Sequence, residues 1–477
     1  MIKIVFIGAG STVFVKNCLG DIMLSENMPE YEIVLYDIDK ERLEESFIVV
    51  NSLNNYLKQG KINITSYCGV ENRKKALINA NFIINAIQVG GYKPSTIIDF
   101  EIPKKYGLEQ TIGDTLGVGG IMRGLRTIKV LKEIAKDIEE VCPDAWLLNY
   151  TNPMAIITNY MQKHTKVKTI GLCHSVQVCV SGLFHSLDMD EYLDGHKETI
   201  AGINHMAWLL EIKDKNGNDL YPEIRKRVKN FNDDNLDELL KRFEIIGNEK
   251  DEYGNIIDTY TLGRYNTIKN DNAFDDKVRF DYVNKFGYYC TESSEHNAEY
   301  SALYIKKNRT DLIKKFNIPI DEYLRRCVNQ IENWKTQKET LLSEKNLSHK
   351  RSREYCSRII EAISTGKPYE FGGNVLNNKI ISNLPKDACV EVTCIANKNG
   401  ITPIYHGELP LELAAMNSLN IYPQLLTVMA AHTGKKEYIY KACMLDPHTS
   451  SILSTDEIVS MCDELILAHK QAGFPVL

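Results

Sequence analysis

The residues best suited to chemistry lie in two short stretches, Gly171–Ser175 and Gly202–His205. The first carries Cys173 and the second His205, a thiol and an imidazole. Thiolate is a soft ligand and imidazole suits transition metals, so the pair favours an ion such as zinc or iron. We therefore predict that Cys173 and His205 bind one metal ion. His174 would point in a different direction from an extended strand end and is a candidate proton donor.

A motif near the start of the chain is typical of dinucleotide binding. Gly8-Ala9-Gly10-Ser11 follows an apolar run and precedes a helical pattern, an arrangement that presents a helix N-terminus to a pyrophosphate. Val13 stands where the third glycine of the usual pattern would be. Asp37 ends the next apolar run, where a carboxylate accepts ribose hydroxyls and repels a 2′-phosphate. The motif predicts NAD rather than NADP, bound by Gly8, Gly10, Ser11 and Asp37.

Other polar residues lie where ligands bind in open α/β sheets. Asn149 and Asn152 follow a predicted strand in Leu148–Pro153 and could orient a sugar or a nicotinamide, or form the turn before the proline. Asp281 and Tyr282 are adjacent, and a base beside a tyrosine suits proton abstraction from carbon. Residues 291–296 are also dense in ionisable groups, although such stretches are more often solvated faces.

These residues require a scaffold of alternating strands and helices. Apolar runs at 3–8, 32–36, 62–67, 81–88, 145–149 and 168–173 alternate with helical patterns at 12–24, 42–57 and 121–142, which is the signature of a parallel sheet. Residues 213–280 are polar and resemble an exposed insertion or cap, and helical periodicity returns at 320–370 and 407–470. We predict an α/β protein with a Rossmann-like NAD-binding domain at 1–198. A mixed α+β domain at 199–477 would serve substrate binding and oligomerisation.

Composition excludes several classes of function. The net charge is −6 and the basic residues are scattered, so nucleic acid is not expected as a partner. No apolar run reaches the roughly 18 residues of a membrane span, and the first apolar run ends in a glycine turn rather than a signal-peptide cleavage site. The twelve cysteines include no C-x-x-C and should be reduced in a cytoplasmic protein.

Taken together, these motifs resemble glycoside hydrolase family 4, the NAD- and metal-dependent glycosidases. The resemblance runs essentially from end to end, and the Cys-His-Ser at 173–175 is similar to that of the bacterial melibiase-type α-galactosidases. The blocks that carry it are, in order, Phe6–Ser11, Leu108–Thr111, Asp114–Gly117, Leu148–Pro153, Gly171–Gln177, Gly202–Ala207 and Gly287–His296.

The resemblance implies that this chain hydrolyses α-galactosides such as melibiose by a redox route. In that route NAD⁺ takes a hydride from C3 of the sugar, a base removes the proton at C2, and the glycosidic oxygen leaves C1. Water then adds and NADH returns the hydride. The metal, which is usually Mn²⁺ in this family, polarises the C2 and C3 oxygens as a Lewis acid.

The resemblance also assigns roles to residues. Cys173 and His205 hold the metal, His174 is the candidate acid, and Asp281 is the candidate base, with Tyr282 as its rival. The implied substrate-binding residues are Asn149, Asn152 and Arg123. Family members form dimers and tetramers, so we expect a homodimer or homotetramer.

Four alternatives differ in what they require of the sequence. Phosphosugar-specific relatives carry an arginine shortly after the segment that matches 89–91, whereas residues 92–96 here contain Lys93 and no arginine, which favours an unphosphorylated galactoside. An α-glucosidase of the same family would share the Cys-His motif. A lactate/malate-type NAD-dependent dehydrogenase would share the nucleotide-binding half but would need no thiolate. A non-catalytic NAD sensor would not need so many ionisable residues in its motifs.

Overall fold

The computed structural model describes residues 1–231, 236–249 and 259–477. Its first half alternates strands and helices, as predicted. The strands are β1 (Ile2–Ile7), β2 (Tyr31–Asp37), β3 (Ile64–Cys68), β4 (Phe82–Asn85), β5 (Trp146–Asn149) and β6 (Lys168–Gly171). The helices are α1 (Thr12–Leu24), α2 (Lys40–Lys58), α3 (Arg73–Leu77), α4 (Ile97–Lys105), α5 (Gly117–Val141), α6 (Met154–His164) and α7 (His174–Leu187). Short helical turns lie at Val70–Asn72, Gly91–Thr96 and Asp190–Tyr192.

The second half contains antiparallel strands and most of the remaining helices. The strands are β7 (Lys197–Ile203), β8 (Met206–Lys213), β9 (Tyr289–Cys290), β10 (Tyr369–Leu376), β11 (Cys389–Asn397) and β12 (Gly400–Pro403). The first helices are α8 (Tyr221–Asn230), α9 (Leu236–Gly247), α10 (Thr259–Asp271), α11 (Lys277–Phe286), α12 (Ser294–Glu299) and α13 (Thr310–Phe316). They are followed by α14 (Glu322–Ser343), α15 (Cys356–Thr365), α16 (Leu411–Thr433), α17 (Glu437–Leu445), α18 (Pro447–Ile452) and α19 (Thr455–Gln471).

All of these strands join one sheet, in the order β3-β2-β1-β4-β5-β6-β10-β11-β7-β8-β9, with β12 beside β11. Strands β1 to β6 are parallel, and every later pairing is antiparallel. The halves meet at the pairing of Gly171 with Asn374. The predicted Rossmann-like α/β fold is confirmed, while the boundary at 198/199 stays a prediction because the sheet runs across it.

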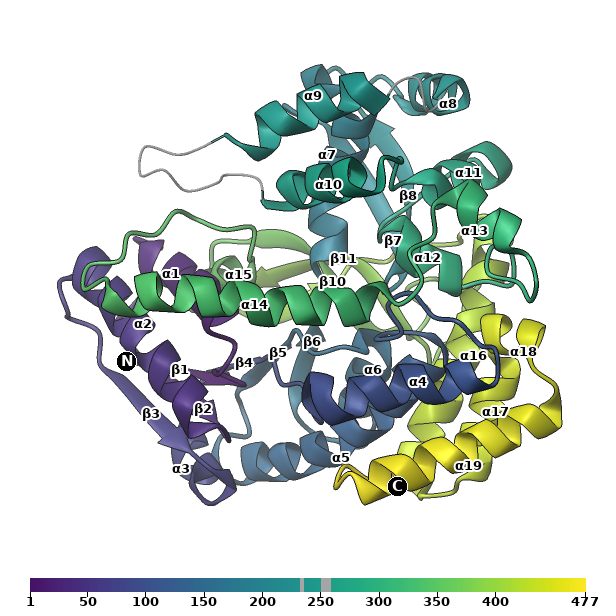
Figure 1. The fold of residues 1–477 in the computed structure, drawn as a ribbon. Coiled ribbons are helices and arrows are strands. Elements are labelled where there is room, and N and C mark those ends of the chain that lie inside the picture. The colour runs from purple at the N-terminus through teal and green to yellow at the C-terminus, as the bar shows by residue number, and fades with distance from the viewer. Residues whose placement is uncertain (232–235, 250–258) are drawn as a thin grey trace.

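Both faces of the parallel half are buried, as the strand sequences require. In β1, Ile4 and Phe6 face one apolar cluster, and Val5 and Ile7 face another on the opposite side of the sheet. Helix α5 lies on the second side and buries the predicted core positions. These positions are Leu125, Ile128, Leu131, Ile134 and Ile138. Figure 1 shows α5 beneath the sheet, next to the yellow C-terminal helices.

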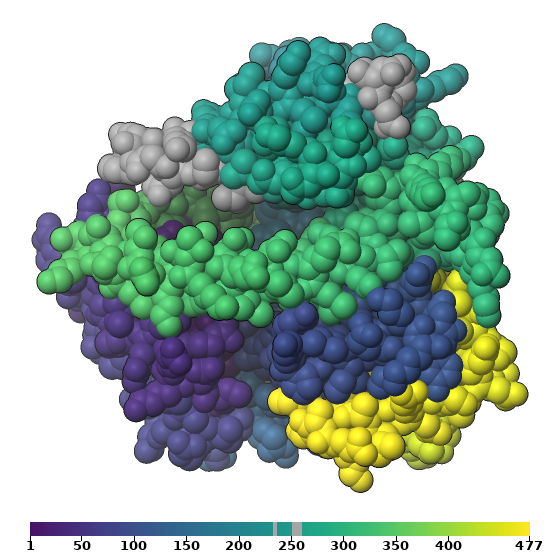
Figure 2. Space-filling model, viewed as in Figure 1, coloured from purple at the N-terminus to yellow at the C-terminus, as the bar shows by residue number. Residues whose placement is uncertain are grey.

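The polar segment at 213–280 contains more regular structure than its composition indicated. Helices α8, α9 and α10 form a group at the top of Figure 1. Their apolar residues, such as Ile224, Phe243 and Ile268, pack with α7 in a third cluster. Parts of the segment, at 232–235 and 250–258, lie outside the described residues. The space-filling view in Figure 2 shows a hollow between this teal group and the green α14.

Within the described ranges, no helix combines the length and the apolar character that a membrane crossing needs. The longest helix, α5, carries charged side chains along one face.

Candidate active site

Cys173 and His205 are brought together by two neighbouring turns. Strand β6 ends at Gly171, so Cys173 does not end a strand, as we had expected, but caps the N-terminus of α7. His205 lies in the two-residue turn between β7 and β8 with φ of +65°. This left-handed conformation is costly for a residue with a Cβ and is often retained at functional sites. The turn buries His205 almost completely.

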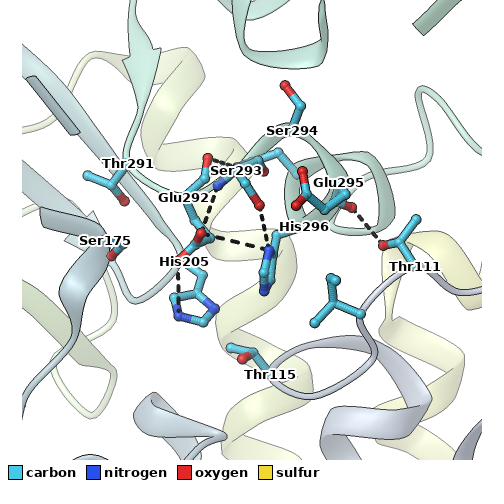
Figure 3. Close-up of polar contacts among 12 residues, drawn as sticks. Thr111, Thr115, Ser175, His205, Thr291, Glu292, Ser293, Ser294, Glu295 and His296 are labelled. Carbon is cyan, nitrogen blue, oxygen red and sulfur yellow. Dashed lines mark hydrogen bonds and ion pairs between the residues drawn. The ribbon is translucent and has the colours of Figure 1, made fainter. Parts of the chain in front are cut away.

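A carboxylate completes the first set of possible metal ligands. Ligand atoms of Cys173, His205 and Glu292 all lie within 4.8 Å of one another. The Nε2 of His205 is 3.4 Å from a carboxylate oxygen of Glu292, and its Nδ1 is 3.3 Å from the hydroxyl of Tyr300. Figure 3 shows the side chains of His205 and Glu292 turned toward each other. Thiolate, imidazole and carboxylate are donors that together suit a divalent transition metal.

A second set shares the same histidine. Ligand atoms of Asp114, His205 and His296 also lie within 4.8 Å of one another. His296 is 3.9 Å from Asp114 and 3.8 Å from Glu292, and its Nδ1 is 2.8 Å from the hydroxyl of Ser293. His205 therefore stands between two groups of donors, one on the side of Cys173 and one on the side of Asp114.

The electrostatics of this cluster are dominated by close opposite charges. Burial alone would lower the pKa of His205, but Cys173 and Glu292 raise it to about 10. Burial alone would raise the pKa of Glu292, but His296 and His205 lower it to about 2. Burial would likewise raise the pKa of Asp114, and Arg123 and His296 lower it. The cluster therefore keeps its carboxylates anionic, which is the form that binds a cation.

His174 is separate from these donors, as predicted. The cause is its position at the start of a helix and not the extended strand end that the sequence indicated. His174 begins α7, and its Nε2 lies 2.7 Å from a carboxylate oxygen of Glu354. Its ring also packs near the rings of Tyr150 and Phe14, at 5.8 and 6.3 Å between centroids. Burial alone would lower the pKa of His174, but the bond to Glu354 raises it to about 9. At neutral pH it is a protonated group with a fixed orientation.

The predicted nucleotide turn has the geometry of a dinucleotide site. Gly8 has φ of +84°, and a Cβ there would lie 2.6 Å from the carbonyl oxygen of Ala86. The amide of Gly10 donates to Asp37 at 2.6 Å, which holds the turn against the end of β2. Ser11 caps α1 without a side-chain bond to its backbone. A side chain at Gly8 or Gly10 would collide with Ala86 or Asp37, so both positions require glycine, as in a tight turn that places a helix N-terminus beside a pyrophosphate.

The three predicted substrate-binding residues have different surroundings. Asn149 is completely buried and bonds to Asn85 and to the carbonyl of Thr151, so it supports the turn after β5. Asn152 donates to Asp114 at 3.3 Å, and its buried Oδ1 has no protein partner. Arg123 donates to the carbonyl of Asn152. Asn152 and Arg123 therefore border the cluster, whereas Asn149 lies behind it.

The predicted base and its rival lie on α11. Asp281 accepts a hydrogen bond from Tyr304 at 3.1 Å. Tyr282 is fully buried and donates to the carbonyl of Asn297 at 3.2 Å. Burial raises the pKa of Tyr282 above its ordinary value. These contacts place both residues in the α11–α12 region. Among the described residues, neither Asp281 nor Tyr282 forms a hydrogen bond or ion pair with Cys173 or His205.

Several residues of the cluster were not among the predicted ligands. Glu292 and His296 are spaced by four residues in the charge-dense segment at 291–296, and this spacing was the available signal. Asp114 belongs to a block that carried the family resemblance but received no role. Glu354, the partner of His174, lies in a segment without any recognisable motif, so its contact depends on the fold alone.

Comparisons with known proteins identify the family of the chain. The model of family 4 glycosyl hydrolases matches residues 3–189, and the model of their C-terminal domain matches residues 200–449. An α-galactosidase of Bacillus subtilis strain 168 is 54% identical over 469 residues, which are 98% of each chain. An α-galactosidase of Rhizobium meliloti strain 1021 is 32% identical over 483 residues, with 98% of this chain and 88% of that protein covered.

A solved structure shows the same fold. It is a 6-phospho-α-glucosidase from gut microorganisms in complex with NAD and Mn²⁺, and its TM-score is 0.76 at 19% sequence identity. The likeness covers 99% of this chain and 98% of that one.

Proposed function

The chain belongs to family 4 of the glycosyl hydrolases, and from this premise we propose that it is an α-galactosidase that requires NAD and Mn²⁺. The observation that carries the substrate assignment is the 54% identity to the Bacillus subtilis α-galactosidase over nearly the whole of both chains. We expect melibiose-like galactosides as substrates. A cytoplasmic location and assembly into a homodimer or homotetramer belong to the same proposal.

The residues present fit both groups. Cys173 and His205 would hold the metal, with Glu292 as the nearby carboxylate, and Gly8, Gly10, Ser11 and Asp37 would hold NAD. When bound, NAD supplies a reversible oxidation of the sugar at C3, and the metal supplies Lewis-acid polarisation of the sugar oxygens. The soft thiolate alone would favour zinc or iron, whereas the carboxylates beside it are ligands that suit Mn²⁺.

The chain's own residues would then handle protons and the sugar. His174 would donate a proton to the leaving glycosidic oxygen, because the bond to Glu354 keeps it protonated at neutral pH. For the base at C2 we retain Asp281 over Tyr282, because the hydroxyl of Tyr282 is buried and already donates to Asn297.

Two residues at the edge of the cluster would orient the substrate. The unpartnered Oδ1 of Asn152 is available to a sugar hydroxyl, and Arg123 lies next to it. Asn149 would act indirectly by fixing the turn that carries Asn152. The absence of an arginine at 92–96 favours a sugar without phosphate.

The experiment is an assay with NAD⁺, Mn²⁺, a thiol reductant and a panel of p-nitrophenyl glycosides at low oxygen. We expect nitrophenol from the α-galactoside without accumulation of NADH, and deuterium at C2 of the galactose formed in D₂O. Preference for the α-glucoside would assign the chain to α-glucosides instead. Stoichiometric NADH without release of nitrophenol would overturn the proposal in favour of a dehydrogenase.

A further inference from the structure

Two strands separate the chain segments that carry Cys173 and His205. Cys173 follows β6 and His205 follows β7, and β10 and β11 lie between these strands in the sheet (Figure 1). In a flat sheet, three spacings of about 4.8 Å would separate β6 from β7 by roughly 14 Å. Ligand atoms of Cys173 and His205 nevertheless lie within 4.8 Å of each other. The chain therefore departs from a flat sheet here, and each segment needs a support of its own.

The support on the Cys173 side is a tyrosine. The amide of Cys173 donates to the hydroxyl of Tyr355 at 2.7 Å, and that hydroxyl lies 3.1 Å from the carbonyl oxygen of Cys173. Tyr355 is buried. The backbone of one predicted ligand is thus fixed without any contact to the turn that carries His205.

The support on the His205 side is a buried carboxyl group. Asn204, which precedes His205 in the turn, donates through Nδ2 to Oε1 of Glu391 at 3.3 Å. Asn374 donates to the same oxygen at 2.8 Å. The side chains of Asn204, Asn374 and Glu391 are at most 1% exposed. Because Asn374 lies on β10 and Glu391 on β11, these bonds connect the turn to the two strands between β6 and β7.

The same residues lie where the halves of the sheet pair. Asn374 pairs with Gly171 of β6 and with Glu391, and Glu391 pairs with Gly202 of β7. A Cβ at Gly171 would lie 2.7 Å from the Cβ of Asn374, so the glycine leaves room for that side chain. The polar cluster of Asn204, Asn374 and Glu391 therefore occupies the seam across which β6 and β7 are related.

This polar cluster is less favourable for stability than an apolar core would be. Oε2 of Glu391 and the Oδ1 atoms of Asn204 and Asn374 are buried, and none has a hydrogen-bond partner among the described residues. Buried polar atoms without partners disfavour the folded state, and each one in a native structure calls for an explanation. The explanation that the contacts support is the positioning of the His205 turn.

We propose that Glu391 is a positioning residue for the metal site, because its bond from Asn204 holds the His205 turn among the donors of the cluster. The inference rests on the proposed function, since it takes His205 as a metal ligand. His205 has φ of +65°, which a residue with a Cβ disfavours, so a bond at the preceding residue biases the turn toward this conformation. Within the described part of the chain, Glu391 forms no hydrogen bond or ion pair with His205, and its effect passes through Asn204.

The bond from Asn204 does not depend on the charge of Glu391. Burial raises the pKa of Glu391, although the amide of Asn374 acts against this. A carboxyl group that is protonated on Oε2 still accepts through Oε1. A glutamine at this position would also present an acceptor oxygen, whereas an apolar side chain would present none.

The test is the affinity of the metal-free protein for Mn²⁺, measured by electron paramagnetic resonance of the free ion, with the melting temperature followed in parallel. Glu391→Leu should raise the dissociation constant about tenfold, the lower end for residues that orient ligands. Glu391→Gln should stay within about threefold of the wild type, because it keeps the acceptor. Unchanged affinity in Glu391→Leu would overturn the proposal, and so would an equal loss in both variants, because the charge would then matter and not the bond.

Asn204→Ala keeps the test decisive if Glu391→Leu folds poorly, because it removes the donor and leaves Glu391 bonded to Asn374. It should also raise the dissociation constant about tenfold, and the double variant should lose no more than either single variant, since both remove one bond. Losses that multiply in the double variant would overturn the proposal.

Asn159→Ala is the matched control. Asn159 is also buried, its side chain donates to the carbonyl of Asp387, and its Oδ1 lacks a partner in the described ranges. It should lower the melting temperature and leave the affinity for Mn²⁺ unchanged. A loss of affinity equal to that of Asn204→Ala would mean that destabilisation alone is responsible, which would overturn the proposal. A wild type that binds no Mn²⁺ would overturn the proposed metal site itself, and this inference with it.

Discussion

The nucleotide turn takes its polar contacts from two neighbouring strand ends, whereas the cluster around His205 gathers its side chains from four distant segments. In the turn, the amides of Gly8 and Ala9 donate to the carbonyl of Tyr36, and that of Gly10 donates to Asp37. In the cluster, the side chains come from residues 114, 173, 205 and 292–296. The first site is held by the pairing of two adjacent strands, β1 and β2, and the second by the fold as a whole.

The difference lies in what each site needs from the rest of the protein. A glycine turn at the start of a helix is preorganised by adjacent residues. The cluster instead depends on supports that bind no ligand themselves. Glu299 accepts hydrogen bonds from the backbone of residues 111–113, and Asn417 and Asn420 hold the backbone beside His205. Substitutions should therefore separate the two sites, with effects on the cluster that spread further.

The largest effect should follow from Cys173→Ser. It removes the thiolate from the donor set, and we expect roughly a thousandfold loss of glycosidase activity, equivalent to about 4 kcal/mol, because a Lewis acid contributes several kcal/mol. Binding of NAD, measured by calorimetry, should change less than twofold because the nucleotide turn is independent of this residue. Binding of Mn²⁺, followed by electron paramagnetic resonance, should weaken strongly.

Cys142→Ser is the control for this substitution. Cys142 is also buried but lies beside Lys3 and Ala80, at the start of β1 and just before β4, which is the edge of the parallel sheet opposite the two sites. It should leave the activity and Mn²⁺ binding intact. A Cys173→Ser variant with full activity would show that the thiol is not a ligand.

The same contrast determines how much could be predicted from the sequence. The alternating apolar runs predicted all six parallel strands, and the glycines after the first of them predicted a tight turn, because these signals are local. The NAD-binding roles of Gly8, Gly10 and Asp37 stay predictions. Cys173 and His205 were chosen as a pair, and the structure brings them together. Asp114 and Glu354 received no role, because their contacts are made by residues that are distant in sequence.

The polar segment at 213–280 was harder to predict from the sequence for a different reason. Its helices bury few apolar residues each, and these meet only when α8, α9 and α10 pack on α7. The predicted strand end at Cys173 was wrong, because β6 ends two residues earlier, at Gly171, and Cys173 is the N-cap of α7. Boundaries of this kind are set by hydrogen bonding in three dimensions.

A smaller effect, on stability, should follow from Glu299→Gln. Burial raises the pKa of Glu299 from 4.5 to about 7, so the folded state favours the protonated carboxyl. The stability that Glu299 contributes is present below pH 4.5 and is lost as pH rises through about 7. Relative to Glu299→Gln, the wild type should therefore lose on the order of 3 kcal/mol across this window.

Urea unfolding of both proteins at several pH values measures this difference. Glu464→Gln is the control, because that half-buried carboxylate lies on α19 and is bonded to Lys105. Its difference from the wild type should stay nearly constant between pH 5 and about 7. If the difference in free energy of unfolding between Glu299→Gln and the wild type does not vary with pH, Glu299 does not titrate in this range. It would then bind the backbone of residues 111–113 as an ionised carboxylate throughout.

The smallest effect should follow from Gly8→Ala, which tests whether the nucleotide turn is as independent as its local contacts indicate. A Cβ at Gly8 would meet the carbonyl oxygen of Ala86 at 2.6 Å, and φ of +84° is unfavourable for alanine. We expect NAD binding to weaken about tenfold, or about 1.4 kcal/mol, with Mn²⁺ binding unchanged. Gly107→Ala is the control, because Gly107 has φ of +83° and open space around its Cβ position but lies outside the turn, so NAD affinity should stay that of the wild type. An unchanged NAD affinity in Gly8→Ala would mean that the close approach to Ala86 does not shape the nucleotide site.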